Sequence, residues 1–227
     1  MTPQAAQRRR DILRAAAALF EEKGYEATRV TDIAARAGVA KGLVFWYFGS
    51  KEGLLHELAA TVEEGLLALI QAAVEGVAAP LERLYAATLV AVHYIDDHYH
   101  LYGAIGAASR NQAVSPFEAA MRTHLAYSTE AMRRYQEEGV ARRSDSPEQL
   151  AYALAAVVNE LVRLRRQGIL ARTTAQTAAM AARFAVHGVA ADTAQAQAAI
   201  AAHPRLARRV AAARRRTPPP LADLLAR

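Results

Sequence analysis

The sequence has 227 residues, of which 28 are lysine or arginine, 22 are aspartate or glutamate and none is cysteine. This length fits one large domain or two smaller ones, and without cysteine the chain has no disulfides, thiolate zinc ligands or cysteine nucleophiles. No uncharged apolar run approaches the roughly 18 residues that a membrane-spanning helix needs, and the chain does not open with the basic, apolar and small-residue order of a signal peptide. We therefore expect a cytoplasmic protein of bacterial type.

The formal net charge of +6 is unevenly distributed along the chain. Residues 1–56 carry a net +3, residues 57–202 a net −3 and residues 203–227 a net +6. Only the two ends therefore suit a polyanion such as DNA. Together with the patterns below, this distribution predicts a head over residues 1–52, a body over residues 53–202 and a basic tail over residues 203–227.

Apolar spacing predicts helices from end to end, and no segment has the alternating pattern of a strand. Residues 8–22 form the first amphipathic pattern, which Gly24 ends, and Ser50 caps a long helix that ends near Pro80. Later helices begin with a capping serine or threonine followed by glutamate or glutamine, at Ser115, Ser146 and Thr173. We expect an all-α protein with about nine or ten helices joined by short loops.

Residues 25–52 contain two short helical patterns separated by Gly38. Thr31 can cap the first helix, and the inward positions of the two helices are Ile33, Ala34, Ala37, Val39, Val44 and Phe48. Two short helices joined by a glycine turn are typical of a helix-turn-helix, whose second helix lies in the major groove of DNA.

The same segment resembles the TetR family of bacterial transcriptional regulators. The family pattern appears here as Gly24-Tyr25, Thr31, Ile33-Ala34, Ala37-Gly38-Val39, Gly42, Val44, Tyr47-Phe48, Lys51 and Leu54, within residues 8–58. The resemblance implies an N-terminal three-helix DNA-binding domain joined by a long helix to a C-terminal helical domain that binds a ligand and dimerises. It also implies that residues 147–166 and 174–189 pair with their mates as a four-helix bundle. The alternative is that these two helices, with their rows of small residues, only fill a core within one chain.

Two residues depart from the family pattern. Ala40 stands where a capping serine is usual, which weakens the N-terminal cap of the recognition helix by about 1 kcal/mol. Phe45 replaces a tyrosine and so removes a hydroxyl that could contact phosphate. Phe45 is expected either in the core or at the DNA, and Trp46 and Tyr47 can replace its lost polar contact.

The resemblance and the side-chain chemistry together assign the DNA contacts. Lys41, Leu43 and Trp46 are expected at base edges, where Leu43 can touch only apolar groups such as a thymine methyl. Phosphate contacts are expected from residues at helix ends and edges, namely Thr28, Thr31, Tyr47 and Lys51. The full predicted DNA-binding set is Thr28, Thr31, Lys41, Gly42, Leu43, Phe45, Trp46, Tyr47 and Lys51. The Arg8–Arg10 triplet either reaches an adjacent minor groove or is a solvated start of the first helix.

A polar and aromatic stretch covers residues 93–102. His93 and Asp97 are one helical turn apart, as are Asp96 and His100, so a His/Asp metal site is geometrically possible. A metal needs three or four converging ligands, so we expect no metal here. The alternatives are a surface-exposed junction or intramolecular polar network, and the lining of an effector pocket. The candidate effector contacts are Tyr94, His98, Tyr102, Arg110, His124, Tyr127, Asn159 and Arg163. Asn159 also fits a satisfied buried amide.

The tail combines clustered arginines with three consecutive prolines at residues 218–220. Proline enforces an extended chain, so the tail is expected either to be a solvating end or to add salt-sensitive DNA affinity.

The expected function is that of a dimeric, sequence-specific DNA-binding transcriptional regulator, a repressor released by a small-molecule effector bound in the C-terminal domain. Its expected partners are a double-stranded DNA operator, a second copy of the chain and the effector, with no cofactor and no membrane. The alternative is a helical sensor or scaffold of the same fold without specific DNA recognition. A helical enzyme is not expected, because the sequence lacks G-x-S-x-G, H-E-x-x-H, G-x-G-x-x-G and G-x-x-x-x-G-K motifs.

Overall fold

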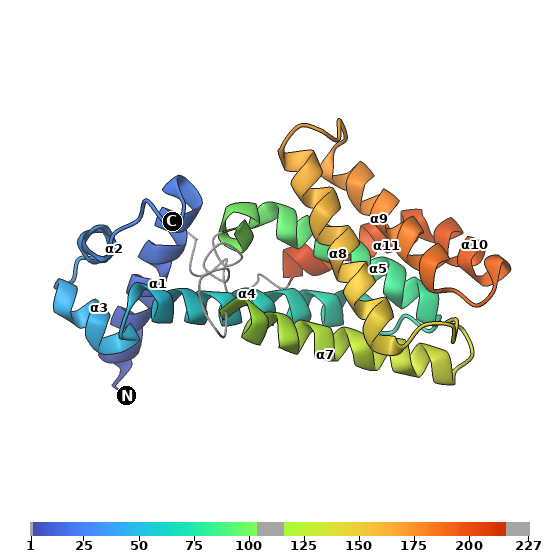
Figure 1. Ribbon diagram of the computed structural model, residues 1–227, viewed down its shortest axis with the longest axis horizontal. Helices are drawn as coiled ribbons and strands as arrows, with labels where there is room; N and C mark the ends of the chain where they lie inside the picture. Colours follow the sequence, from blue (N-terminus) through green and yellow to red (C-terminus); the bar gives the residue numbers. More distant parts are fainter. Residues whose placement is uncertain (1, 104–115, 217–227) are drawn as a thin grey trace. The chain divides into compact units, whose positions relative to one another are not determined.

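The computed structural model describes residues 2–103 and 116–216, with only the backbone described for residues 116–122 (Figure 1). The predicted all-α class is confirmed, because the described residues contain helices and no strand beyond one isolated bridge between Ala141 and Ala190. The described residues form two compact units. One contains residues 2–65, 98–103 and 116–121, and the other contains residues 66–97 and 122–216.

The first unit is built from α1 (Pro3–Lys23), α2 (Val30–Ala37), α3 (Lys41–Phe48) and the first part of α4 (Lys51–Val74). The first helix begins at Pro3 and not at the predicted Arg8, because Thr2 caps it: its Oγ1 accepts the Ala5 N–H at 3.3 Å. Side chains less than 2% exposed form the core of this unit, including Ile12, Phe20, Ile33, Val44, Leu54 and Leu58.

Two turns fix the directions of the short helices. Gly38 ends α2 with a φ of 66°, in the left-handed region that favours glycine, and so makes the predicted turn into α3. Ser50 caps α4 as predicted, since its Oγ accepts the Gly53 N–H at 3.0 Å. These local signals explain why the helix-turn-helix could be located from sequence.

The second unit has α5 (Pro80–Asp97) at its centre, in contact with α8 (Pro147–Arg166), α9 (Thr174–Val189), α10 (Thr193–Ala201) and α11 (His203–Arg216). α7 (Pro116–Glu137) precedes α8 in the chain. Ser146 and Thr173 cap α8 and α9 with the predicted reciprocal boxes. Most side chains of α5 are buried, which fits a helix covered on several sides.

Small residues on α9 face the interior of the chain. Ala178, Ala181, Ala182 and Ala185 are at most 1% exposed, and α9 packs against α5. Alanines let two helices approach closely. This row of α9 therefore serves the intramolecular core, and a dimer would need another face of the helix.

The first part of the C-terminal basic segment differs from the prediction of a solvating end. Residues 203–216 form α11, which buries Leu206, Val210 and Ala213 and packs on α5. Its arginines bind groups of the same unit: Arg205 pairs with Glu82 at 2.6 Å, Arg209 Nε donates to Ala73 O at 2.6 Å, and Arg214 pairs with Asp97. The prediction is wrong for residues 203–216, because an apolar strip and acidic partners hold this helix to the body. Residues 217–227 lie outside the described residues.

A search for membrane-spanning segments found none in the described parts of the chain, where every helix is too short or too polar to cross a bilayer.

Candidate nucleic-acid interface

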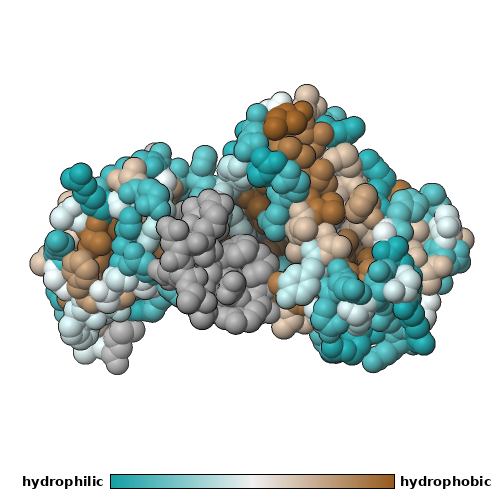
Figure 2. Space-filling model, in the orientation of Figure 1, coloured by the Kyte–Doolittle hydropathy of each residue, from teal (hydrophilic) through white to brown (hydrophobic). Residues whose placement is uncertain are grey.

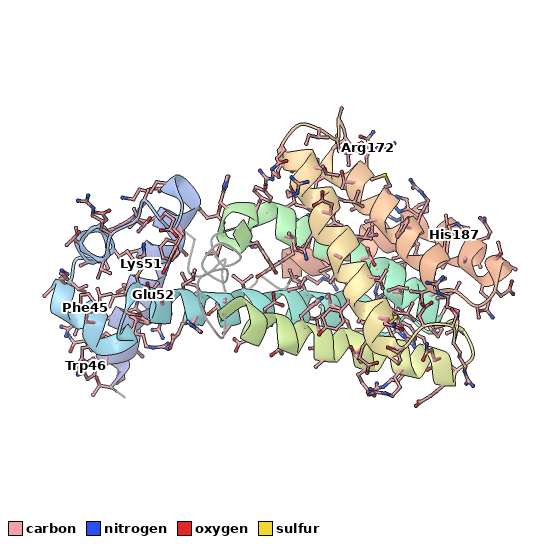
Figure 3. All side chains as sticks on the ribbon, in the orientation of Figure 1. Phe45, Trp46, Lys51, Glu52, Arg172 and His187 are labelled. Atoms are coloured by element: carbon pink, nitrogen blue, oxygen red, sulfur yellow. The ribbon has the colours of Figure 1, made fainter. Side chains whose placement is uncertain are left out.

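The eight-residue helix α3 has one buried and one exposed side. Val44 and Phe48 are buried at 1% and 8% exposure. On the other side Phe45 is 42% and Trp46 is 73% exposed, and Figure 3 shows both side chains projecting outward from the first unit. Phe45 therefore does not pack in the core, and its contact with DNA stays a prediction.

Four residues make up the exposed side of α3, and we call them the α3 face: Lys41, Gly42, Phe45 and Trp46. A Cβ atom added at Gly42 would meet no other atom within 4 Å, so the space above this residue is open. Leu43 lies at the edge of the face and is half-buried. The α3 face thus offers a cation, two aromatic rings and open space at Gly42 to an approaching partner.

Tyr47 anchors the recognition helix. Its hydroxyl donates to the carbonyl oxygen of Ala5 in α1 at 3.1 Å, and its ring packs edge-on against Trp46 with centroids 4.6 Å apart. Because the phenolic proton is used within the protein, Tyr47 does not fit the predicted role of phosphate donor. At its N-terminus α3 is capped by Ala40 with no side-chain hydrogen bond, as the sequence indicated.

The two predicted threonine contacts behave differently. Thr28 is 1% exposed and its hydroxyl donates to the Gly24 carbonyl at 2.7 Å, so the predicted phosphate contact is wrong for this side chain. Thr31 is exposed, but α2 begins at Val30 and its N-cap is Arg29, so Thr31 does not cap the helix. Thr31 stays a candidate phosphate contact on the basis of exposure alone.

Lys51 is also engaged inside the first unit. Its Nζ donates to the carbonyl oxygens of Tyr25 at 3.0 Å and Thr28 at 3.1 Å, and lies 4.1 Å from the centre of the Tyr25 ring. Burial, and then the neighbouring Glu52 carboxylate, raises the pKa of Tyr25, so its hydroxyl stays protonated and donates to Glu52. Lys51 therefore fixes the α1–α2 connection to the start of α4 (Figure 3).

Replacing Lys51 by methionine is expected to destabilise the first unit by about 1–2 kcal/mol, because two carbonyl groups lose a charged donor. The slope of log binding constant against log salt concentration should stay unchanged, because Lys51 makes no phosphate contact in this account. Loss of one phosphate contact would reduce that slope by about one. Chemical denaturation and DNA titrations at several salt concentrations measure both quantities. A slope reduced by about one, with unchanged stability, would restore Lys51 to the phosphate contacts.

The Arg8–Arg10 triplet lies within α1 and not on an extended arm. Arg9 pairs with Glu57 of α4 and lies over the Phe48 ring, and Arg10 donates to Gln7 at 2.6 Å. The triplet therefore lies inside a helix, as one alternative expected, but it does not start that helix, because α1 begins at Pro3.

The predicted effector contacts are divided between the units. His98 and Tyr102 belong to the first unit, whereas Tyr94, His124 and Tyr127 belong to the second. Burial lowers the pKa of His124, which favours the neutral imidazole. Asn159 and Arg163 have partners on their own helix, Ala155 for the amide and Glu160 for the guanidinium. Arg110 lies outside the described residues.

The predicted polar junction at residues 93–102 has a buried carboxylate at its centre. Asp96 is 4% exposed and accepts hydrogen bonds from Arg165, Arg166 and Thr174, the last at 2.7 Å. These contacts bind the end of α5 to the end of α8 and the start of α9, which fits the alternative of an intramolecular polar network. Within the described residues, no group of three or more His, Cys, Asp or Glu side chains is arranged to hold a metal ion.

Glu63 of α4 is a buried polar residue that the sequence analysis did not select. It is 6% exposed, and burial raises its pKa to about 7, although the Tyr102 hydroxyl donates to it at 3.5 Å and opposes that shift. The signal was available, because Glu63 lies four residues after Ala59 and three before Leu66, both of them inward positions of α4.

Exposed large apolar side chains of the described residues fall into two groups. One is Phe45 and Trp46 on the α3 face, and the other is Tyr152, Ile169 and Phe184 on α8, α9 and their connection. Figure 2 shows hydrophobic surface over the region where Figure 1 places α8 and the α8–α9 connection. Exposed apolar groups of this kind mark interaction surfaces.

A helix-turn-helix with an exposed second helix, followed by a helical body, is an arrangement typical of helical DNA-binding proteins. Residues 12–58 match the model of the bacterial regulatory proteins of the tetR family. The N-terminal helix-turn-helix domain is therefore that of the TetR family.

Curated relatives agree with this assignment. The transcriptional repressor KstR2 of Mycobacterium tuberculosis is 38% identical over 96 residues, which are 42% of this chain and 48% of KstR2. The regulator HbdR of an Aromatoleum species is 38% identical over 78 residues, 34% of each chain. The matched part of this chain thus spans about half the length of KstR2 and about a third of the length of HbdR.

Solved structures extend the likeness to the body. A TetR-family transcriptional regulator from a Rhodococcus species matches with a TM-score of 0.71 and 21% identity, over 82% of this chain and all of the other. The KstR2 structure of M. tuberculosis matches with a TM-score of 0.61 and 26% identity, over 82% of this chain and 96% of the other. The helical body therefore has the fold of TetR-family regulators.

Proposed function

We propose that this protein is a dimeric, sequence-specific DNA-binding repressor whose operator affinity a small molecule changes. The observation that carries the proposal is the α3 face, which leaves Lys41, Phe45 and Trp46 exposed on the second helix of a helix-turn-helix. Such a helix presents its exposed side chains to base edges in the major groove. KstR2 is named a transcriptional repressor, and we extend repression to this chain, acting in the cytoplasm.

The dimer is proposed to form through α8 and α9. One helix-turn-helix contacts few bases, so two must be held about one DNA turn or a multiple apart. The free side of α9 carries Met180 and Phe184, and that of α8 carries Val157 and Leu161, all at least partly exposed. A second copy of the chain would bury these groups across a two-fold axis. The buried alanines of α9 take no part in this contact.

For the effector site we retain Tyr94, His124 and Tyr127, because these side chains are buried or half-buried in the second unit. A mainly apolar environment with a few polar groups is typical of small-molecule sites. Regulation follows from linkage between two conformations of the protein that differ in DNA affinity. An effector that binds more tightly to the conformation with lower DNA affinity weakens operator binding, and the ratio of its two affinities limits the size of the effect.

Alanine variants of Lys41 and Trp46 test the DNA-binding proposal. Each is expected to weaken operator binding by about tenfold or more, because each removes a contact worth about 1–3 kcal/mol. Both residues are exposed, so thermal unfolding should change little. The binding is measured by fluorescence anisotropy with operator DNA. Wild-type affinity in both variants would reject α3 as the recognition helix.

A further inference from the structure

We propose that each operator half-site contains a guanine and a thymine on adjacent or next-adjacent base pairs, recognised in the major groove by Lys41 and Phe45. The inference rests on the proposed function and names the feature of DNA that the α3 face would recognise.

Lys41 supplies the polar part of this recognition. It is exposed at the start of α3, and no described acidic side chain forms an ion pair with it. An ammonium group only donates hydrogen bonds, and guanine presents two acceptors, N7 and O6, in the major groove. The α3 face contains no Asn, Gln, Asp or Glu, the side chains that pair with adenine or cytosine. The polar chemistry of this face therefore favours guanine.

Phe45 supplies the apolar part. Its ring has no donor or acceptor and is 42% exposed. Among the four bases only thymine presents an apolar group, its C5 methyl, in the major groove. Covering that methyl would remove apolar surface of both partners from water. The replacement of tyrosine by phenylalanine at this position thus favours a methyl contact over a phosphate contact.

The geometry limits how far apart the two bases can lie. Lys41 and Phe45 are separated by one helical turn, and the Lys41 ammonium lies 5.6 Å from the centre of the Phe45 ring. Successive base pairs are about 3.4 Å apart along the duplex. The two side chains can therefore contact base pairs no more than about two steps apart. Gly42 lies on the same face without a side chain, which allows α3 to approach the groove closely.

Modified operators test the thymine contact. The operator is first obtained by selection from genomic fragments, and each thymine of a half-site is then replaced by deoxyuridine, which lacks only the C5 methyl. Wild-type protein is expected to bind one such operator about four-fold more weakly, as loss of one buried methyl group predicts. In Phe45→Ala the thymine and uracil operators should bind equally. Phe45→Leu keeps an apolar side chain and should keep the preference for thymine.

The guanine contact is tested in the same way with 7-deazaguanine, which lacks the N7 acceptor. Wild-type protein should bind about ten-fold more weakly when the contacted guanine is replaced, as loss of one part of a base contact predicts. Lys41→Ala should bind the guanine and 7-deazaguanine operators equally. Equal wild-type affinity for thymine and uracil operators at every position, or a uracil effect that persists in Phe45→Ala, would overturn the inference. A selected operator without a guanine and thymine within two steps would also overturn it and leave the proposed function standing. Selection of no sequence at all would reject the proposed function itself.

Discussion

Replacing Asp96 by asparagine is expected to lower the free energy of unfolding of the second unit by about 2–3 kcal/mol. The buried carboxylate is the common acceptor for Arg165, Arg166 and Thr174, so its neutralisation leaves two cations near the protein interior without their counter-charge. Both arginines keep some solvent contact, with side chains 18% and 35% exposed, so the effect should be smaller than for a fully buried pair. Urea denaturation followed by circular dichroism measures it.

The neighbouring Asp97 provides the matched control. Its carboxylate is about half exposed and pairs with Arg214. An exposed pair contributes little, so Asp97→Asn should cost less than about 1 kcal/mol. Equal effects of the two variants would contradict the proposed role of Asp96.

The pH dependence of stability gives a second readout of the same group. Burial raises the pKa of Asp96, but the hydrogen bonds from Arg165, Thr174 and Arg166 together outweigh it, so the pKa lies below its ordinary value. A carboxylate with a lowered folded-state pKa stabilises the protein above its unfolded-state pKa, and this stability is lost as the pH falls through the folded-state pKa. The difference in free energy of unfolding between wild type and Asp96→Asn should therefore be largest near neutral pH and should shrink below about pH 4.

Replacing Phe184 by glutamate is expected to convert the proposed dimer to monomers and to reduce operator affinity at least about 100-fold. Phe184 is 58% exposed on the free side of α9, so in a dimer the introduced carboxylate would be buried without a partner. The loss of DNA affinity follows because a monomer gives up the second, effectively intramolecular half-site contact. Sedimentation and operator titration measure the two effects.

Ala194→Glu serves as the control for this substitution. Ala194 is exposed in the first turn of α10, where an added carboxylate is tolerated by the helix dipole. This variant should remain dimeric and bind the operator. A dimer that persists in Phe184→Glu would place the interface elsewhere.

Sequence patterns predicted the head well because its signals are local. Gly38, Ser50 and the inward positions Val44 and Phe48 each act within a few residues, and the structure uses all four as expected. The functions of Thr28, Tyr47 and Lys51 were less predictable, because each depends on a carbonyl group that folding brings near from another segment. Side chains suited to phosphate are equally suited to backbone oxygens.

In the body, composition was a poorer guide than spacing. The arginines of residues 203–216 favoured a solvated tail, although Leu206, Val210 and Ala213 already had helical spacing. Which of two apolar faces of α9 would pack internally could not be read from one sequence, since both the alanine row and the Met180–Phe184 side fit a helix contact. The position of α5 in the fold decided between them.

Selection of DNA fragments from the source genome tests the central claim most directly. Wild-type protein and the Lys41→Ala/Trp46→Ala double variant are each incubated with the fragments at low salt and without effector, and the retained DNA is sequenced. The proposal predicts that wild type enriches an inverted repeat with half-sites about one DNA turn, or a multiple, apart, and that the double variant enriches none. Enrichment of no sequence by folded wild-type protein, or of the same sequence by both proteins, would contradict recognition of DNA by the α3 face.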